Sequence, residues 1–266
     1  MTSGVGPAWP LGPRKPSLGA SEVHVWCAHL QVPEPQVARL YVTLSTDERE
    51  RASRYRFPRD QRRFIASRGW LRAILRSYVG IEATAIRFHY NPHGKPELET
   101  GDLQFNLAHS EDLALYAIAR GRRVGIDIER IRPGIADDKL TDSVFAPREI
   151  AALRSLPPHD QQRSFFACWT RKEAYVKARG EGLVMPLDAF EVSLLPGDPA
   201  ALLSTPAEPQ EAARWTLCEL DVGPDYAATL AIEGHDGRLR LWQYPIPADP
   251  AEGTEWTNEK TARTQT

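Results

Sequence analysis

The chain has 266 residues, of which 42% are hydrophobic and 26% charged, and its formal net charge is −2. This length allows one large domain or two small ones with a real core, and the near-neutral charge gives no global sign of a nucleic-acid partner. No window approaches 18 apolar residues, and the first residues lack a continuous apolar run, so we expect neither export nor membrane insertion.

The elements of the first half are predicted from hydrophobic periodicity and from the Gly and Pro residues that interrupt helices and strands. Residues 1–20 are rich in both and predict a flexible extension. Ser45 is a candidate N-cap, followed by an acidic first turn. In chain order we expect a strand at 23–26, helices at 49–55 and 59–78, and strands at 86–90, 103–107 and 113–119.

The second half repeats this pattern. We expect a strand from Val124, helices at 147–155 and 161–179, strands at 190–194, 215–220, 226–232 and 239–244, and a flexible tail at 248–266. Strands that begin at Val23 and Val124 lie 101 positions apart, and the two long helices share that offset. We therefore predict an α+β protein with two similar subdomains, at residues 21–121 and 122–247.

Charged residues are distributed unevenly along the chain, although the net charge is small. Residues 49–76 contain ten arginines and two acidic residues. Such a run is most often a solvated helix face, but it could also bind nucleic acid with a steep salt dependence. The three cysteines are far apart and form no CxxC spacing, which indicates reduced thiols in a cytoplasmic protein.

Two stretches concentrate acidic side chains. The first, VGIDIER at residues 124–130, alternates apolar and acidic residues, which places Asp127 and Glu129 on one face of a strand. In the second, WTRKEAYVK at residues 169–177, Glu173 and Lys177 lie one helical turn apart. Each pattern alone is usually a solvated surface. Together they would suit a divalent cation and a phosphate-bearing substrate.

These two stretches resemble the signature motifs of the Sfp-type 4'-phosphopantetheinyl transferases. The segments that match are GIDIE and, 46 positions later as measured from Asp127 to Glu173, WTRKEAYVKARGEG, which ends in Gly180 and Gly182. The resemblance covers roughly residues 45–195. It implies two α/β subdomains related by a pseudo-twofold axis, with the cofactor in the cleft between them.

The resemblance also implies residue roles. Asp127, Glu129 and Glu173 would hold Mg²⁺, with Mn²⁺ as an alternative. Glu173 would also be the general base, and Lys177 would neutralise a diphosphate oxygen of coenzyme A.

Three further residues would contact coenzyme A. His109, in the segment NLAHS, and Lys95, at the tip of a GKP turn, would contact phosphates, and Arg51 would meet the 3'-phosphate. Two positions depart from the family pattern. Ala108 replaces a hydroxyl residue, so one side-chain hydrogen bond to the cofactor would be missing. Glu48 stands where some members have a lysine, so the phosphate clamp would be weaker, or rebuilt from Arg54, Arg62 or Arg63.

The implied reaction is transfer of the 4'-phosphopantetheine group of coenzyme A to a serine of an apo acyl, peptidyl or aryl carrier protein, of the holo-[acyl-carrier-protein] synthase type. The implied partners are the carrier protein and coenzyme A, with no nucleic acid and no membrane, and a monomer would suffice. Two alternatives remain: an inactive homologue that binds carrier protein or coenzyme A, and a nucleic-acid-binding protein.

Overall fold

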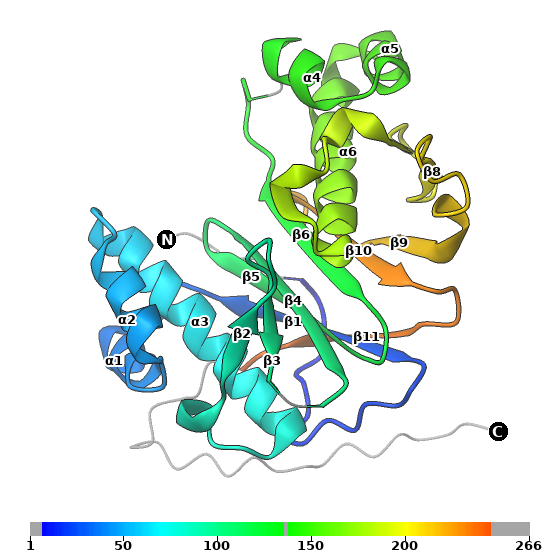
Figure 1. Ribbon diagram of the computed structural model, residues 1–266. Helices are drawn as coiled ribbons and strands as arrows, with labels where there is room; N and C mark the ends of the chain where they lie inside the picture. The colour runs from blue at the N-terminus through cyan, green and yellow to red at the C-terminus, as the bar shows by residue number, and fades with distance from the viewer. Residues whose placement is uncertain (1–6, 100, 136–137, 246–266) are drawn as a thin grey trace, which may run out of the picture.

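The computed structural model describes residues 7–99, 101–135 and 138–245, and these form two main sheets, each covered on its outer face by a 22-residue helix, together with two small two-stranded sheets (Figure 1). The protein is therefore α+β, as predicted. The two sheets face each other across a shared apolar layer, which is built largely from the inward residues of strands such as Val25, Leu115, Ile126 and Leu230.

The N-terminal sheet has the strand order β11-β1-β5-β4, antiparallel except for the parallel pair β11 and β1. The elements of the N-terminal half are β1 (Glu22–His29), α1 (Glu34–Tyr41), α2 (Thr46–Ser53), α3 (Pro58–Val79), the short 3-10 helix η1 (Ala83–Ala85), β2 (Phe88–Tyr90), β3 (Pro96–Leu98), β4 (Leu103–Ser110) and β5 (Leu113–Arg120). Strands β2 and β3 pair with each other in a separate two-stranded sheet.

The C-terminal sheet has the order β6-β10-β9 and is antiparallel. The elements of the C-terminal half are β6 (Val124–Arg130), α4 (Asp138–Val144), α5 (Pro147–Ser155), α6 (Pro158–Arg179), η2 (Gly182–Val184), η3 (Leu187–Ala189), β7 (Glu191–Val192), β8 (Leu202–Ser204), η4 (Ala212–Arg214), β9 (Trp215–Glu219) and β10 (Tyr226–Glu233). Strands β7 and β8 pair with each other in a separate two-stranded sheet. The last strand, β11 (Arg238–Gln243), returns to the N-terminal sheet.

The two halves share one plan, which confirms the predicted similarity. In each half a strand leads to a long helix and then to two strands, and the strand order β1-β5-β4 corresponds to β6-β10-β9. Helix α3 begins with Pro58 and α6 with Pro158, and both end at a glycine in the left-handed region, Gly80 (φ 68°) and Gly180 (φ 75°). The apolar stripe of α3 is buried, including Trp70, Leu71 and Ile74.

Two segments differ from the expectation. Within the expected flexible extension at 1–20, residues 7–20 are described, and there Trp9 is buried and the amide of Gly12 donates to the carbonyl of Gln243 at 3.0 Å. Residues 1–6 and the predicted tail at 248–266 lie outside the described residues. The strand β11, assigned to the C-terminal subdomain from its position in the chain, pairs instead with β1 because Trp242 packs on Trp26 at 4.9 Å between ring centroids.

Several short elements escape the periodicity analysis. These are α1, α4, β3, β8 and the 3-10 helices. Helix α1 has prolines at 33 and 35, which read as a loop, yet Pro33 stands before its first turn and Pro35 within it, where a missing amide proton costs nothing. Conversely, the strand expected at 190–194 shortens to β7, because Ser193 bonds to the 199–201 loop.

Candidate active site

Helix α6 lies directly on strand β6, and this contact creates the site. A Cβ atom on Gly125 would stand 2.1 Å from the carbonyl oxygen of Ala174 and 2.3 Å from the amide nitrogen of Ala178, so only glycine permits the approach. Ile126 and Ile128 face the shared core, and Asp127 faces α6. The predicted alternation of β6 is therefore confirmed, and it delivers Asp127 to the helix that carries Glu173 and Lys177.

Asp127 and Lys177 form a buried ion pair. The Lys177 ammonium donates to Asp127 Oδ1 at 2.5 Å, and the Asp127 side chain is only 4% exposed. Burial raises the pKa of Asp127, against the opposing charge of Lys177. Burial acts to lower the pKa of Lys177, but the charges of Asp127, Glu173 and Glu129 outweigh it and raise that pKa. Lys177 is therefore a cation that three carboxylates hold in its charged form.

Glu129 lies where the two halves meet. Its carboxylate accepts a hydrogen bond at 3.0 Å from Ser110 Oγ, at the end of β4, and the Ser110 oxygen in turn accepts from the Arg130 amide at 3.0 Å. Farther along the same strands, Asn106 Oδ1 accepts from the amide of Ile126 at 2.8 Å. Burial, and then the charge of Asp127, raise the pKa of Glu129. Side chains of β4 thus fix the position of β6.

Glu173 is the least restrained of the three carboxylates. It is half-buried on α6, and among the described residues it accepts no hydrogen bond and forms no ion pair. Burial raises its pKa, with the charge of Asp127 adding to this and that of Lys177 opposing it. A carboxylate with a raised pKa and free oxygens is suited to accept a proton near neutral pH.

His109 lies at the same junction, among cations. It is exposed near the end of β4, and desolvation by surrounding atoms, followed by the charges of Lys177, Arg63 and Arg51, lowers its pKa. Arg63 is anchored by the β4–β5 turn, where it donates to Glu111 at 2.8 Å and to Asp112 at 2.7 Å. The positive charges of Lys177, Arg63 and Arg51 all act on this imidazole, which favours a polyanion in this region.

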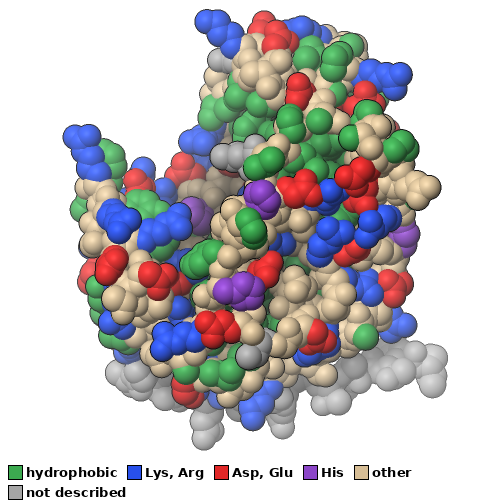
Figure 2. Space-filling view, viewed as in Figure 1, with side chains coloured by type: hydrophobic (Ala, Val, Ile, Leu, Met, Phe, Trp, Pro, Cys, Tyr) green, Lys and Arg blue, Asp and Glu red, His purple; other side chains and the backbone are tan. Residues whose placement is uncertain are grey.

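Arg51 is exposed on α2, with its guanidinium 5.4 Å from the centre of the Phe64 ring. It lines a surface pocket of about 610 Å³ together with Asp47, Glu50, Arg54, Tyr55 and Tyr90. Figure 2 shows a hollow between the α1–α3 lobe and the C-terminal lobe, with basic side chains along its rim.

The structure explains why Glu48 stands where some members of the family have a lysine. Glu48 is buried and accepts from Arg72 Nε at 2.6 Å and from Arg68 Nε at 2.8 Å. It also accepts from the amide of Ser45, which confirms Ser45 as the N-cap of α2. Glu48 therefore anchors α2 to α3 and is buried between them. Of the candidate replacements, Arg62 pairs with Glu34 at 2.8 Å and Arg63 is held as described, which leaves Arg54 beside Arg51 in the pocket.

Lys95 lies in the loop between β2 and β3, as predicted, but its ammonium is bonded to the protein backbone. Its ammonium donates to the main-chain carbonyls of Lys177 at 2.8 Å, Val124 at 3.2 Å and Ala178 at 3.4 Å. The reason is that the β2–β3 loop folds onto the C-terminal end of α6, where carbonyl groups lack partners within the helix. Lys95 thus bonds to the main chain of β6 and α6, the two elements that carry the site.

Three carboxylates were expected to hold a metal ion. Within the described ranges, no group of three or more His, Cys, Asp or Glu side chains is arranged to hold one by itself. Like charges separate without a counterion, and Lys177 already occupies Asp127 Oδ1. Asp127 Oδ2, however, is buried without a hydrogen-bond partner among these residues, and Glu173 is free. These oxygens fit Mg²⁺, which usually takes one or two carboxylates together with waters and substrate phosphates.

The raised pKa of Glu173 leads to a stability prediction. A folded-state pKa above the unfolded value means that the charged form disfavours folding, so Glu173→Gln raises the thermal midpoint of the ligand-free protein at pH 7. The gain shrinks as the pH falls through the raised pKa, and it disappears below the ordinary glutamate value because both forms are then neutral. Calorimetry of both proteins from pH 4 to pH 8 measures this, and a variant less stable than the parent at pH 7 would contradict it.

Sequence reasoning missed the supporting residues. Ser110 and Asn106 belong to the same NLAHS segment as His109, and their polar side chains on a buried strand were the available signal. Lys172 lies within the second motif but is fully buried, where it pairs with Glu149 at 2.8 Å and donates to the carbonyl of Leu187 at 2.7 Å. Lys172 thus anchors α6 within the C-terminal half, while Glu173 faces the site.

Comparison with known proteins identifies the class that this geometry suggests. Residues 123–231 match the family model of the 4'-phosphopantetheinyl transferase superfamily, and residues 32–120 match that of the 4'-phosphopantetheinyl transferase N-terminal region. The chain is 42% identical over 241 residues to 4'-phosphopantetheinyl transferase HetI of Nostoc sp., which covers 89% of this chain and 98% of that protein. It therefore belongs to the 4'-phosphopantetheinyl transferase family.

Other relatives are more distant. Sfp of Bacillus subtilis, also named a 4'-phosphopantetheinyl transferase, is 28% identical over 152 residues, which is 57% of this chain and 66% of that protein. The crystal structure of holo-[acyl-carrier-protein] synthase from Thermotoga maritima aligns with 16% identity and a TM-score of 0.33, over 42% of this chain and 62% of that one.

Proposed function

We propose that this protein transfers the 4'-phosphopantetheine group of coenzyme A to a serine hydroxyl of an apo carrier protein. Family membership supports the reaction. The observation that supports the proposal for these residues is that Asp127 holds Lys177 at 2.5 Å while the charges of Glu173 and Glu129 also act on Lys177. The charges of Lys177 and Arg51 in turn act on His109, and Arg51 lines the pocket on α2. The cations suit a substrate with three phosphates, and the carboxylates suit the chemistry at its diphosphate.

The reaction is attack of the serine oxygen on the β-phosphorus of coenzyme A. A serine O–P bond forms, the bond between that phosphorus and the bridging oxygen breaks, and adenosine 3',5'-bisphosphate leaves. Glu173 takes the serine proton, since its oxygens are free and its pKa is raised. Lys177 neutralises the diphosphate, and His109 donates to a phosphate oxygen.

Mg²⁺ is the metal that this donor set favours, with Mn²⁺ as the alternative. Asp127 would bind through Oδ2, which is buried and otherwise unpaired, Glu129 directly or through water, and Glu173 as the third carboxylate. The ion supplies neutralisation of charge on the diphosphate when bound. Asp127 already holds Lys177, so the chain itself orients one positive charge toward the same region.

The finer assignments are also proposals. We infer a holo-[acyl-carrier-protein] synthase type of activity that a single chain can carry out, since both halves contribute side chains to the junction. Cys27, Cys168 and Cys218 are free, which is consistent with a cytoplasmic protein. Among the described residues, no helix is long and apolar enough to cross a membrane.

A nucleic-acid partner is not favoured, because much of the basic run at 49–76 is neutralised within the protein. Arg68 and Arg72 are buried against Glu48, and Arg76 pairs with Glu82 at 2.8 Å. Nor do the comparisons favour an inactive homologue, since the relatives described above carry transferase names.

One assay tests the proposal. The full chain is incubated with fluorescently tagged coenzyme A, Mg²⁺ and apo acyl or peptidyl carrier proteins, and the label on the carrier is followed with time. Transfer to the carrier serine is expected, and none to a carrier whose serine is alanine. Binding of coenzyme A without transfer to any carrier would favour the inactive homologue instead.

The Arg51 assignment gives a second expected result. Arg51→Ala weakens coenzyme A binding by roughly 10- to 100-fold, since a charge-assisted hydrogen bond contributes about 1.5–3 kcal/mol. Binding of 3'-dephospho-coenzyme A, which lacks the group that Arg51 meets, changes by less than about threefold on the same scale. Calorimetric titration of both ligands measures this, with the exposed Arg148→Ala as the matched control. Equal losses for the two ligands would remove Arg51 from the 3'-phosphate and direct attention to Arg54.

A further inference from the structure

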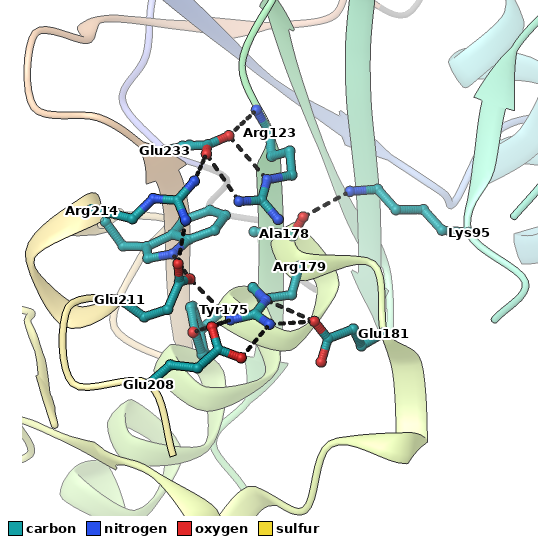
Figure 3. A network of polar contacts seen from close by, with 11 residues as sticks. Lys95, Arg123, Tyr175, Ala178, Arg179, Glu181, Glu208, Glu211, Arg214 and Glu233 are labelled. Atoms are coloured by element: carbon teal, nitrogen blue, oxygen red, sulfur yellow. Dashed lines mark hydrogen bonds and ion pairs between the residues drawn. The ribbon is translucent and has the colours of Figure 1, made fainter. Parts of the chain in front are cut away.

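The loop between β2 and β3 reaches from the N-terminal half to the C-terminal end of α6. Asn91 Nδ2 donates to the carbonyl of Gly180 at 2.8 Å, and the Lys95 ammonium contacts the carbonyls of Lys177, Val124 and Ala178. Figure 3 shows the Lys95 side chain extended toward the Ala178 carbonyl. Two side chains of one half thus bond to the backbone of the other.

Hydrogen bonds within the loop itself define its conformation. Asn91 Oδ1 accepts from the amides of His93 and Lys95, both at 2.9 Å, and the Asn91 amide donates to the carbonyl of Lys95 at 3.0 Å. Gly94, with φ 86°, supplies the left-handed turn. These bonds hold Asn91 and Lys95 side by side, so that both point at α6.

The two glycines that close the second motif admit the loop. A Cβ atom on Gly180 would lie 3.1 Å from Asn91 Nδ2 and 3.4 Å from Lys95 Cδ, and one on Gly182 would lie 3.4 Å from His93 Cβ. Both glycines also have positive φ, 75° and 58°. The GKP turn and the GEG segment are therefore two sides of one contact.

This contact acts on the elements that carry the site. The last carbonyls of a helix have no partner within it and carry partial negative charge, so an ammonium there is stabilising. Lys95 binds the carbonyl of Lys177, whose side chain holds Asp127, and also the carbonyl of Val124, where β6 begins. One side chain therefore ties together the backbones of the helix and strand that bear Lys177 and Asp127.

A second set of contacts fixes the other side of the helix end. Arg179 donates to Glu181 at 2.8 Å and to Glu211 at 2.9 Å, and its guanidinium lies 6.0 Å from the centre of the Tyr175 ring (Figure 3). Those partners all belong to the C-terminal half. Lys95 and Asn91 supply the restraint from the N-terminal half.

We propose that Lys95 and Asn91 are positioning residues, which cap α6 across the junction and set the geometry of Lys177 relative to Asp127, and that Lys95 does not contact a phosphate of coenzyme A. The proposal rests on the transferase function proposed above. The half-buried position of Lys95 supports it, and the loss of hydration lowers the pKa of this ammonium to about 8.

The test compares Lys95→Met, Asn91→Ala and the double variant, with the exposed Lys15→Met as the matched control. Three quantities are measured on the full chain: hydrogen exchange of the amides at 177–182, affinity for coenzyme A and for 3'-dephospho-coenzyme A, and kcat and KM of transfer. A loss of positioning lowers kcat by about 10- to 100-fold, since a displacement of about 1 Å can cost that much.

We expect faster hydrogen exchange of the amides at 177–182 in both single variants. Affinity for coenzyme A and for 3'-dephospho-coenzyme A should change equally, each by less than about threefold, because a positioning residue does not contact either ligand. The double variant should lose little more than Lys95→Met, since both residues act through one helix end. Asn91→Ala, which retains Lys95, carries the test if Lys95→Met fails to fold.

Two results would overturn the inference. One is a selective loss of affinity for coenzyme A over 3'-dephospho-coenzyme A in Lys95→Met, because it would place the ammonium on the 3'-phosphate. The other is unchanged exchange at 177–182. If the parent protein transfers nothing to any carrier, the proposed function fails, while exchange and ligand affinity still decide the role of Lys95.

Discussion

Replacing Asp127 with Asn lowers transfer by at least about 10²-fold at saturating coenzyme A, the scale expected when electrostatic stabilisation at a reacting centre is removed. The amide keeps the volume of the side chain and one acceptor for Lys177, but it loses the negative charge. Lys177 then lacks the buried counterion at 2.5 Å that orients it, and the proposed metal loses its best-placed oxygen.

The measurement is single-turnover transfer to an apo carrier over a range of Mg²⁺ concentrations. Asp198→Asn, an identical change in an exposed loop, is the control. The thermal midpoint of each variant is recorded, so that a lower rate is compared at equal folded fraction. Turnover of Asp127→Asn within threefold of the parent would remove Asp127 from the reaction and with it the metal assignment.

Glu173→Gln separates two roles of one carboxylate. A residue that only binds metal can be replaced in part by an amide oxygen, and higher Mg²⁺ then restores the rate. A general base cannot be replaced, because an amide does not accept a proton, so the variant stays slow by about 10²–10⁴-fold at saturating Mg²⁺. Coenzyme A still binds, since Lys177, His109 and Arg51 are unchanged.

Two titrations decide between the roles, coenzyme A affinity and single-turnover rate, each at rising Mg²⁺ and with the exposed Glu99→Gln as control. Recovery to near the parent rate would mean that Glu173 is only a metal ligand. The general base would then be Glu129 or a water. The stabilisation of the ligand-free protein predicted for the same variant provides a separate check that Glu173 is charged and partly desolvated at neutral pH.

Local pattern predicted the parts of the site that depend on local geometry. Alternation along 124–130 placed Asp127 and Glu129 correctly, and helical spacing placed Glu173 one turn from Lys177, because side-chain direction in a strand or helix follows from sequence position alone. The repeat at one offset likewise predicted two halves of the same plan.

Positions that depend on a distant partner were not predictable in the same way. Lys95 belongs to a loop, and nothing in its neighbourhood in the sequence indicates three carbonyls from the other half. Glu48 is buried because Arg68 and Arg72, twenty or more positions away, reach back to it from α3. A strand was expected at 239–244 and is observed as β11, but its partner β1 lies more than 200 positions earlier.

That last pairing affects how the chain folds during synthesis. Among the described residues, one edge of β1 pairs with β5 and the other with β11, whose six residues pair with Glu22 through Cys27. A ribosome releases the N-terminal end first, so β1, β4 and β5 can assemble while the edge of β1 still presents unpaired amides and carbonyls. The first half to be made is therefore the last to be completed, and it waits for nearly the whole of the second half to leave the ribosome.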